Sequence, residues 1–248
     1  MNKKIRVAVA GLGAIGKSLS TKLAAGAVPG VELTAVSAKN HDKANEFVKT
    51  LAHPVKVLRI EDLEPEADVV VECAPAEFLG DIIAPFLKKQ KKAIVLSVGA
   101  ILFRPDLVEL AKQSGGVIMV PTGALIGLDA MIGAADLIEN NISVQGLTEP
   151  LKVFSGNAKE AAKGFPANLN VVVALALAGN GPENTLLEIW ADPTVVRNTH
   201  TITVDSDSAK FTMTMENIPS ENPKTGRIVA QSVVAMLRKM TSHFQVGT

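Results

Sequence analysis

The spacing of hydrophobic residues along this chain predicts two regions of different architecture. In the first half, short continuous runs of Val, Ile and Ala alternate with longer stretches in which apolar residues recur at helical spacing. Continuous apolar runs of this length are typical of strands that are buried on both faces of a parallel sheet. The predicted strands are residues 5–10, 31–37, 55–58, 68–72, 93–96 and 117–120, and the predicted helices are residues 15–25, 42–51, 76–88 and 105–113. This alternation predicts an α/β fold with a doubly wound parallel sheet of the Rossmann type.

After Pro121 the pattern changes. The spacing predicts a helix over residues 128–138, a strand over 142–148, and a buried helix over 168–178, which is apolar nearly all round. Further strands are predicted over residues 186–191, 199–204 and 209–215, and an amphipathic helix over 226–240. The last two strands alternate apolar and polar residues, as an antiparallel sheet with one covered face does. We therefore expect a Rossmann domain over residues 1–121 and an α+β domain over 122–248, with the helix 226–240 packing back on the first domain.

Composition excludes several classes of partner. The chain has 248 residues, of which 20% are charged, and its formal net charge is zero, so neither nucleic acid nor an anionic membrane is an expected partner. The single cysteine, Cys73, excludes an internal disulfide and a multi-cysteine metal site, and we expect no metal. A strand follows the initial Met-Asn-Lys-Lys at once and the apolar runs are short, so we expect a cytoplasmic protein without a signal peptide or membrane span.

A glycine-rich turn joins the first predicted strand to the first predicted helix. It reads Gly11-Leu12-Gly13-Ala14-Ile15-Gly16. In this context Gly11 permits a tight turn, Gly13 lets the backbone approach a pyrophosphate, and Gly16 lets the helix pack closely on the strand. The backbone N–H groups at the helix start, from Ala14 and Ile15 onward, hold the phosphates. The strand, turn, helix and second strand together predict dinucleotide binding.

The end of the second predicted strand bears on the choice of cofactor. Many NAD-specific folds carry a carboxylate there, which binds the ribose 2′-hydroxyl. This chain has Ser37-Ala38-Lys39-Asn40 instead. A hydroxyl and a lysine would accept the 2′-phosphate of NADP, although Lys39 is equally well explained as an exposed loop lysine. We expect NADP to be used at least as well as NAD.

Several segments in the rest of the chain resemble the L-aspartate dehydrogenase family. They are residues 72–74 (ECA), 96–100 (LSVGA), 121–130 (PTGALIGLDA), 153–158 (VFSGNA), 165–171 (FPANLNV), 191–193 (ADP), 197–200 (RNTH) and 216–225 (ENIPSENPKT). The resemblance covers nearly the whole chain in the right order. It implies reversible oxidative deamination of L-aspartate to iminoaspartate, or after hydrolysis to oxaloacetate and ammonia, in NAD biosynthesis. It also implies that His200 is the catalytic histidine and that Ala124 and Asn170 contact the cofactor.

The residue types themselves are compatible with that chemistry. Amine oxidation needs a base, and histidine has an ordinary pKa near working pH. His200 follows a polar Arg-Asn-Thr at a strand start, and Asp192 either orients it or simply ends the preceding strand. Asn170 either binds the nicotinamide carboxamide or caps the buried helix.

Further candidates line the expected cofactor crevice and the substrate site. Cys73 ends the fourth strand, where an open α/β sheet binds its ligand, so we expect it to contact the cofactor rather than to act as a nucleophile. Ala74 and Gly99 are small enough for the nicotinamide half to approach. A dicarboxylate needs donors at both ends, and the candidates are Thr122, Asn198 and Lys224. Arg197 is more simply a solvated loop arginine.

Two alternatives remain open from the sequence. Family members carry a longer segment before Val153-Phe154, whereas this chain passes directly through residues 146–150, so the enzyme could reduce a different amino or imino acid. A nucleotide-binding regulator would keep the glycine turn and would not need His200. We also expect a homodimer that associates through the strand-rich second half.

Overall fold

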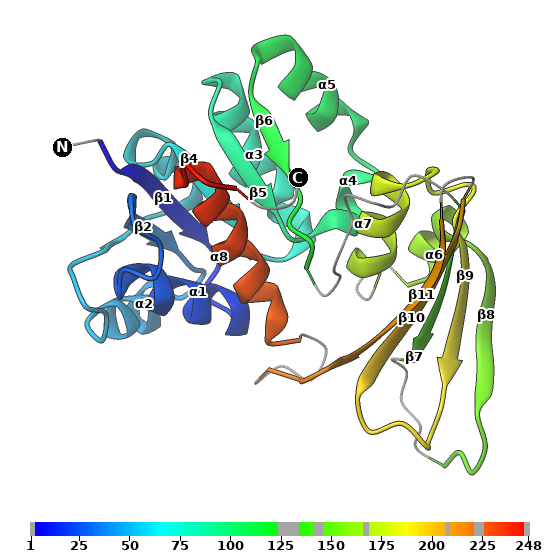
Figure 1. Cartoon of the computed structure of the whole chain (residues 1–248). Coiled ribbons are helices and arrows are strands. Elements are labelled where there is room, and N and C mark those ends of the chain that lie inside the picture. Colours follow the sequence, from blue (N-terminus) through cyan, green and yellow to red (C-terminus); the bar gives the residue numbers. More distant parts are fainter. Residues whose placement is uncertain are drawn as a thin grey trace. The chain divides into compact units, whose positions relative to one another are not determined.

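The computed structural model describes residues 3–123, 134–140, 146–165, 169–206, 209–220 and 226–245, with the backbone alone for 134–140. They fall into two compact units. The first unit lies within Met1–Gly123 together with Val229–Val246, and the second lies within Ala124–Ile228. Figure 1 shows the elements of both.

The first unit contains a six-stranded parallel sheet in the order β3-β2-β1-β4-β5-β6. Its strands are β1 (Ile5–Ala10), β2 (Val31–Ser37), β3 (Lys56–Val57), β4 (Val69–Glu72), β5 (Lys92–Val95) and β6 (Val117–Met119). This confirms the predicted doubly wound sheet. The strand order reverses between β1 and its two neighbours β2 and β4, and such a reversal opens a crevice at the carboxyl ends of the strands.

The helices of the first unit begin and end largely where the sequence predicts. They are α1 (Ala14–Ala24), α2 (His41–Val48), α3 (Leu79–Lys88), α4 (Val98–Ile101), α5 (Pro105–Ser114) and α8 (Ile228–Thr241), with short 3₁₀ turns at Ile60–Asp62, Glu64–Glu66 and Ala76–Phe78. Pro105 opens α5, and Gly115, with φ of 78°, ends it in the left-handed conformation. The short α4 was not predicted.

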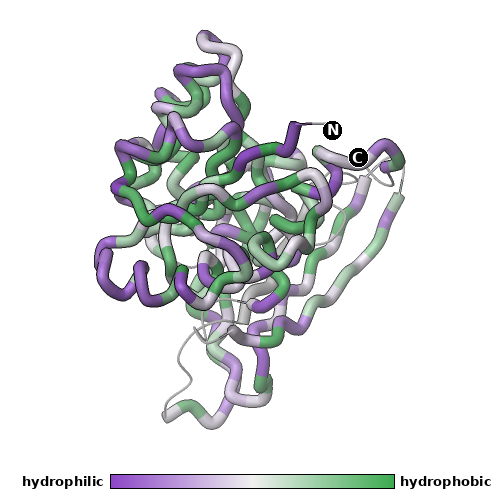
Figure 2. The backbone as a smooth tube through the Cα atoms, turned by 90° about the vertical axis from the view of Figure 1, so that its left-hand side faces the viewer, coloured by the Kyte–Doolittle hydropathy of each residue, from purple (hydrophilic) through white to green (hydrophobic). Residues whose placement is uncertain are grey.

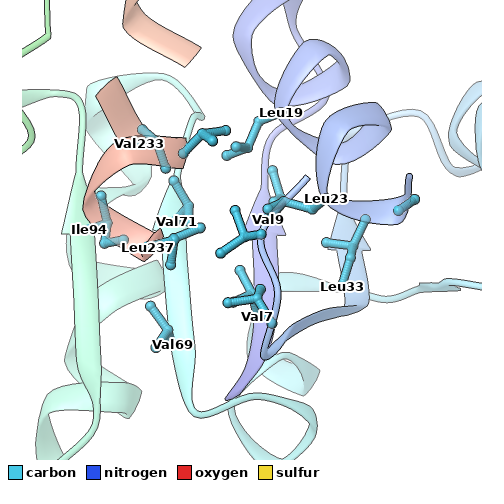
Figure 3. Packing of buried hydrophobic residues seen from close by; sticks show 14 of the residues in the cluster. Val7, Val9, Leu19, Leu23, Leu33, Val69, Val71, Ile94, Val233 and Leu237 are labelled. Carbon is cyan, nitrogen blue, oxygen red and sulfur yellow. The ribbon is translucent and has the colours of Figure 1, made fainter. Parts of the chain in front are cut away.

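Two hydrophobic layers cover this sheet. On one face, Val7 and Val9 pack with Leu19 and Leu23 of α1, and Val233 and Leu237 of α8 belong to the same cluster (Figure 3). On the other face, Ala8 and Val70 share a cluster with residues of α3 and α5. The guanidinium of Arg238 also donates to the carbonyl oxygen of Ala27, at 2.9 and 3.2 Å. A helix from the end of the chain therefore completes the core of the N-terminal sheet. Figure 2 shows hydrophobic and hydrophilic residues interspersed along the backbone.

The second unit contains a five-stranded mixed sheet in the order β11-β10-β7-β9-β8. Its strands are β7 (Ala134–Asn140), β8 (Leu151–Asn157), β9 (Leu186–Ala191), β10 (Asn198–Asp205) and β11 (Lys210–Asn217). β7 and β9 are parallel, and the other neighbours are antiparallel. Two helices, α6 (Ala158–Gly164) and α7 (Asn170–Ala178), lie beside the sheet (Figure 1).

Two predictions for this half were wrong where the structure describes the residues. The helix expected over 128–138 is a strand from residue 134 onward, because this segment pairs with both β9 and β10 and those ladders override its helical spacing. Residues 146–148 form a turn and a bend instead of strand. Residues 128–133 and 142–145 lie outside the described part of the chain.

Residues along β10 alternate in burial, so one face of this sheet is covered. His200, Ile202 and Val204 are buried, whereas the intervening Thr201 and Thr203 are partly exposed. None of the helices in the described part of the chain combines the length and apolarity needed to cross a bilayer.

Candidate functional site

A groove of about 840 Å³ opens at the carboxyl ends of the first unit's strands. Its lining includes the candidate cofactor residues Gly11, Gly13, Ser37, Lys39, Cys73 and Ala74. These residues come from the ends of β1, β2 and β4 and from the turn that enters α1. The fold thus gathers into one groove residues that are more than sixty positions apart in the sequence.

The three glycines of the turn differ in what surrounds them. Gly11 has φ of +104°, and a Cβ there would lie 2.5 Å from the carbonyl oxygen of Cys73. A Cβ on Gly16 would lie 1.9 Å from the carbonyl oxygen of Gly11. Gly13 has no atom within 4 Å of its Cβ position, so its surroundings are open. Gly11 and Gly16 are therefore required by packing, whereas Gly13 leaves space beside the backbone.

That open space lies where a helix begins. Gly13 precedes α1 and no side chain caps the helix there, and the first turn, which starts at Ala14 and Ile15, carries no acidic residue. The first N–H groups of a helix lack partners within the helix, and its dipole favours an anion at this end. The turn therefore has the room and the donors that the pyrophosphate of a dinucleotide needs.

The groove is cationic at the end of β2. Its lining carries Lys17, Lys39, Lys43 and Arg59, with Glu61 as an acidic residue among them. The guanidinium of Arg59 lies 3.2 Å from Glu61 and 3.3 Å from Asp62, which balance its charge. Sequence reasoning found Lys39 and missed Lys43 and Arg59, because it followed only the residues directly after the strand.

A buried carboxylate fixes the other rim of the crevice. Glu72 is fully buried at the end of β4, and it accepts hydrogen bonds from Ser97 N and Ser97 Oγ, both at 2.9 Å, and from Leu96 N at 3.1 Å. Burial raises the pKa of this carboxyl, and the three donors oppose that effect. Glu72 therefore links the end of β4 to the turn between β5 and α4. Gly99 lies in α4, directly after this turn.

The neighbouring Cys73 has the electrostatics of a structural thiol. Desolvation, together with the charge of Glu72, raises the pKa of the Cys73 thiol far above its ordinary value. A thiol held in its protonated form is a poor nucleophile. This agrees with the expectation that Cys73 lines the groove without attacking substrate.

In the second unit, His200 is almost completely buried on β10, with 1% of its surface exposed. Burial lowers its pKa from 6.5 to about 4, so the imidazole is neutral at pH 7. Its Nδ1 atom is buried and has no hydrogen-bond partner in the described part of the chain. A neutral imidazole with an unpaired nitrogen is chemically able to take up a proton.

The other candidate residues are distributed as follows. Asp192 accepts hydrogen bonds from Thr194 N and Thr194 Oγ1, at 2.8 and 2.6 Å, so it closes the turn after β9. Arg197 is exposed and pairs with Glu216 at 3.5 Å. Asn198 lies two residues before His200 on β10, Asn170 is the first residue of α7, and Thr122 precedes Gly123, whose N–H donates to Ser232 of α8. Ala124 and Lys224 lie outside the described residues.

Comparison with known proteins gives consistent matches over the whole chain. The family described as "Aspartate dehydrogenase, C-terminal" matches residues 125–240, and "Homoserine dehydrogenase, NAD binding domain" matches residues 11–121. L-aspartate dehydrogenase 3 of Bordetella bronchiseptica is 53% identical over 268 aligned positions, which cover 99% of this chain and 98% of that protein. L-aspartate dehydrogenase of Bradyrhizobium diazoefficiens is 50% identical, and the alignment covers 100% of this chain and 95% of that protein.

Solved structures agree at the level of fold. Aspartate dehydrogenase from Thermotoga maritima superposes with a TM-score of 0.78 at 24% identity, covering 98% of this chain and 99% of that one. Biliverdin reductase from Synechocystis gives a TM-score of 0.56 at 14% identity, covering 98% of this chain and 93% of that one. At these identities the likeness concerns the arrangement of the elements.

The lowered pKa of His200 predicts a pH dependence of stability. An unfolded chain restores an ordinary histidine pKa near 6.5, so between pH 6.5 and 4 the unfolded state binds a proton that the folded state does not. Stability should therefore fall as the pH decreases through this window, and His200 should account for about 2 kcal/mol between pH 7.5 and pH 5. Urea unfolding of the wild type and His200→Gln at both pH values measures this contribution.

The control is His243→Gln, which makes the same change at an exposed histidine. It should keep the wild-type dependence on pH. If His200→Gln loses as much stability as the wild type between the two pH values, the imidazole is not desolvated in the folded protein.

Proposed function

This chain belongs to the L-aspartate dehydrogenase family, and we propose from that premise how its residues carry out the reaction. The protein is an oxidoreductase that uses NAD or NADP and interconverts L-aspartate with iminoaspartate, or with oxaloacetate and ammonia after hydrolysis. When bound, the nicotinamide coenzyme supplies the acceptor or donor of hydride at the substrate α-carbon. The observation that carries the proposal is that one chain combines open space beside the backbone at Gly13 with a buried, neutral His200.

We propose that the two halves of the chain divide binding from chemistry. Residues 1–121 form the dinucleotide-binding domain, and residues 122–248 form the domain for substrate and association, with helix α8 contributing to the core of the first. The pyrophosphate lies against the turn formed by Gly11, Gly13, Ala14, Ile15 and Gly16. The nicotinamide half is held by Cys73, Ala74, Gly99, Ala124 and Asn170.

His200 acts as the acid–base residue. In the oxidative direction it accepts a proton from the substrate ammonium and releases it to solvent, and it then accepts another from the water that attacks the imine. A pKa of about 4 in the free protein makes it a weak base, but an adjacent carboxylate favours the protonated imidazole. The binding of a dicarboxylate therefore raises the basicity of His200 at the moment when a base is needed. Thr122, Asn198 and Lys224 are the proposed contacts to the substrate.

His200→Ala should reduce kcat for NADPH oxidation with oxaloacetate and ammonium at least about 100-fold, because a positioned acid–base group contributes that much. NADPH binding, followed by the fluorescence of the coenzyme, should not change. His243→Ala is the matched control and should turn over at the wild-type rate.

Two outcomes would contradict the proposed role of His200 or the proposed substrate. Wild-type rates in His200→Ala would remove this residue from the mechanism. If the wild type uses a different 2-oxo acid well and oxaloacetate poorly, the substrate is another amino acid.

We propose that NADP is bound at least as well as NAD, with Ser37 and Lys39 at its 2′-phosphate. The support is the cationic lining near the end of β2, where many NAD-specific folds place a carboxylate. Lys39→Glu should raise the KM for NADP about tenfold or more, because it replaces an attractive charge by a repulsive one, and should leave the KM for NAD within twofold. Steady-state kinetics with both coenzymes measures the effect.

Lys112→Glu makes the same change on α5, away from the residues that line the groove, and should alter neither constant. Equal losses for NAD and NADP in Lys39→Glu would place Lys39 away from the 2′-position.

We also propose a cytoplasmic homodimer that associates through the outer face of the second sheet. This face presents the threonine pairs Thr201–Thr214 and Thr203–Thr212 and the 56% exposed Leu186. The same face carries the ion pairs Lys152–Glu188 and Lys210–Asp205, whose opposite charges offset each other, so it remains suited to self-association by a twofold axis. Light scattering should give a mass near twice the 26.0 kDa of the chain, and Leu186→Glu should shift it toward one chain. A wild-type mass of one chain would contradict the dimer, and cell fractionation tests the location.

A further inference from the structure

The buried face of β10 and β11 carries three polar side chains close together. The antiparallel register places Asn198 directly opposite Asn217, and His200 follows two residues after Asn198 on the same face of β10. Residues directly opposite in such a ladder have Cα atoms about 5 Å apart, and two residues along a strand span about 7 Å. One small molecule can therefore reach all three side chains.

Each of these side chains has a buried polar atom without a partner. Asn198 Oδ1, Asn217 Nδ2 and His200 Nδ1 are enclosed, yet none makes a hydrogen bond in the described part of the chain. Asn217 is 6% exposed and His200 1%. Among the described residues one further buried side-chain atom is in this condition, Ser20 Oγ in α1. Unpaired buried polar groups cost stability and are rare, so three at one place call for a cause.

The opposite face of the same two strands shows that this pattern is not a general property of the ladder. There Thr201 faces Thr214 with 3.2 Å between their hydroxyl oxygens, and Thr203 faces Thr212 at 3.3 Å. The polar groups on this outward face are thus paired with each other, and the buried polar atoms on the other face are not. Burial without pairing is the arrangement expected where a ligand supplies the missing partners.

The side chain of Asn217 packs beside Gly226. Gly226 forms a bridge with Pro219, and a Cβ on Gly226 would lie 3.1 Å from Asn217 Oδ1 and 3.4 Å from Asn217 Cγ. The carbonyl oxygen of the amide therefore lies on the side of Gly226. The donor atom Nδ2 is the part of the amide left without a partner.

We propose that Asn217 is a substrate-binding residue, whose Nδ2–H donates to a carboxylate of the substrate, while Asn198 Oδ1 opposite it accepts from the substrate's amino or imino nitrogen. This rests on the proposed function, and it adds to it the residue that recognises the carboxylate. An unpaired donor and an unpaired acceptor match the two polar groups of an α-amino acid. Because the Asn217 amide is neutral, it brings the carboxylate near His200 without adding a positive charge that would oppose protonation of the imidazole. The substrate class that fits is therefore an amino or imino acid with a carboxylate within reach of this pair.

The test is Asn217→Leu, which keeps the branched shape of the side chain and removes its hydrogen-bonding atoms. The KM for oxaloacetate should rise at least tenfold, and the KM for NADPH should stay within twofold. The thermal midpoint should be equal to or higher than that of the wild type, because an unpaired amide is replaced by an apolar group. A hydrogen-bonded structural asparagine would respond in the opposite way, with a lower midpoint and an unchanged KM, and this result would overturn the proposal.

Two further variants keep the result interpretable. Asn217→Asp has nearly the same shape and faces the substrate with a carboxylate, so it should raise the KM for oxaloacetate at least as much, and an unchanged KM would again overturn the proposal. Asn184→Ala is the matched control, because the Asn184 side chain donates to the carbonyl of Asn180 in a turn of the same unit, and its kinetic constants should be those of the wild type.

Binding of succinate separates this inference from the proposed function. Succinate is a dicarboxylate that cannot react, and calorimetric titration in the presence of NADP measures its affinity without turnover. If the wild type binds succinate at least ten times more tightly than Asn217→Leu, the carboxylate site stands even when oxaloacetate is not turned over. Equal affinities, or no binding to the wild type, would overturn it.

Discussion

The close approach of three backbone segments is the constraint on which the N-terminal unit depends. The carbonyl of Gly11, the start of α1 at Gly16 and the end of β4 at Cys73 meet at distances that leave no room for a Cβ. Because they meet, the helix begins directly at the carboxyl end of β1, beside the end of β2. Gly11 N also donates to the carbonyl of Ser37 at 2.8 Å, which ties the turn to β2. The groove, its donors and its cationic end all follow from this junction.

The buried polar groups of the two units differ in whether they have hydrogen-bond partners. Glu72 is fully buried, and three donors from Leu96 and Ser97 surround its carboxylate. A buried charge that is satisfied in this way rigidifies its surroundings, and here it holds two strand ends in place. His200 and Asn217 are also buried, and His200 Nδ1 and Asn217 Nδ2 lack hydrogen-bond partners in the described part of the chain. The first arrangement is that of a structural support, and the second is that of a site prepared for a ligand.

The weak basicity of His200 in the free protein has a functional consequence. A desolvated imidazole stays neutral at the pH of a cell, so it does not attract anions before the proper substrate arrives. A bound carboxylate then favours its protonation. Burial is costly for a histidine, but here it makes the basicity of His200 depend on bound substrate. The nearby amides of Asn198 and Asn217 are neutral, so they do not change this dependence.

Local sequence determined the elements whose burial is nearly complete. β1 and β2 have the predicted bounds, because they are mostly buried, without a break over residues 7–10 and 35–37, and polar turns follow them. The roles of Gly11 and Gly16 could be predicted for a similar reason, since the geometry of the turn is local. β8 was missed because it is an edge strand with exposed residues and an irregular register near Lys152, and such a strand leaves only a weak pattern.

Only the tertiary structure decided which distant segments of the chain pair with each other. The resemblance of the sequence to a family identified His200. Asn217 could be identified as a candidate only from the strand register, which places it opposite Asn198. In the same way, residues 134–140 became a strand because β9 and β10 lie on both sides of them, and α8 joined the first sheet through contacts more than two hundred residues apart. A local pattern records which faces are buried, whereas the partner on the other side is set by packing and hydrogen bonding across the whole fold.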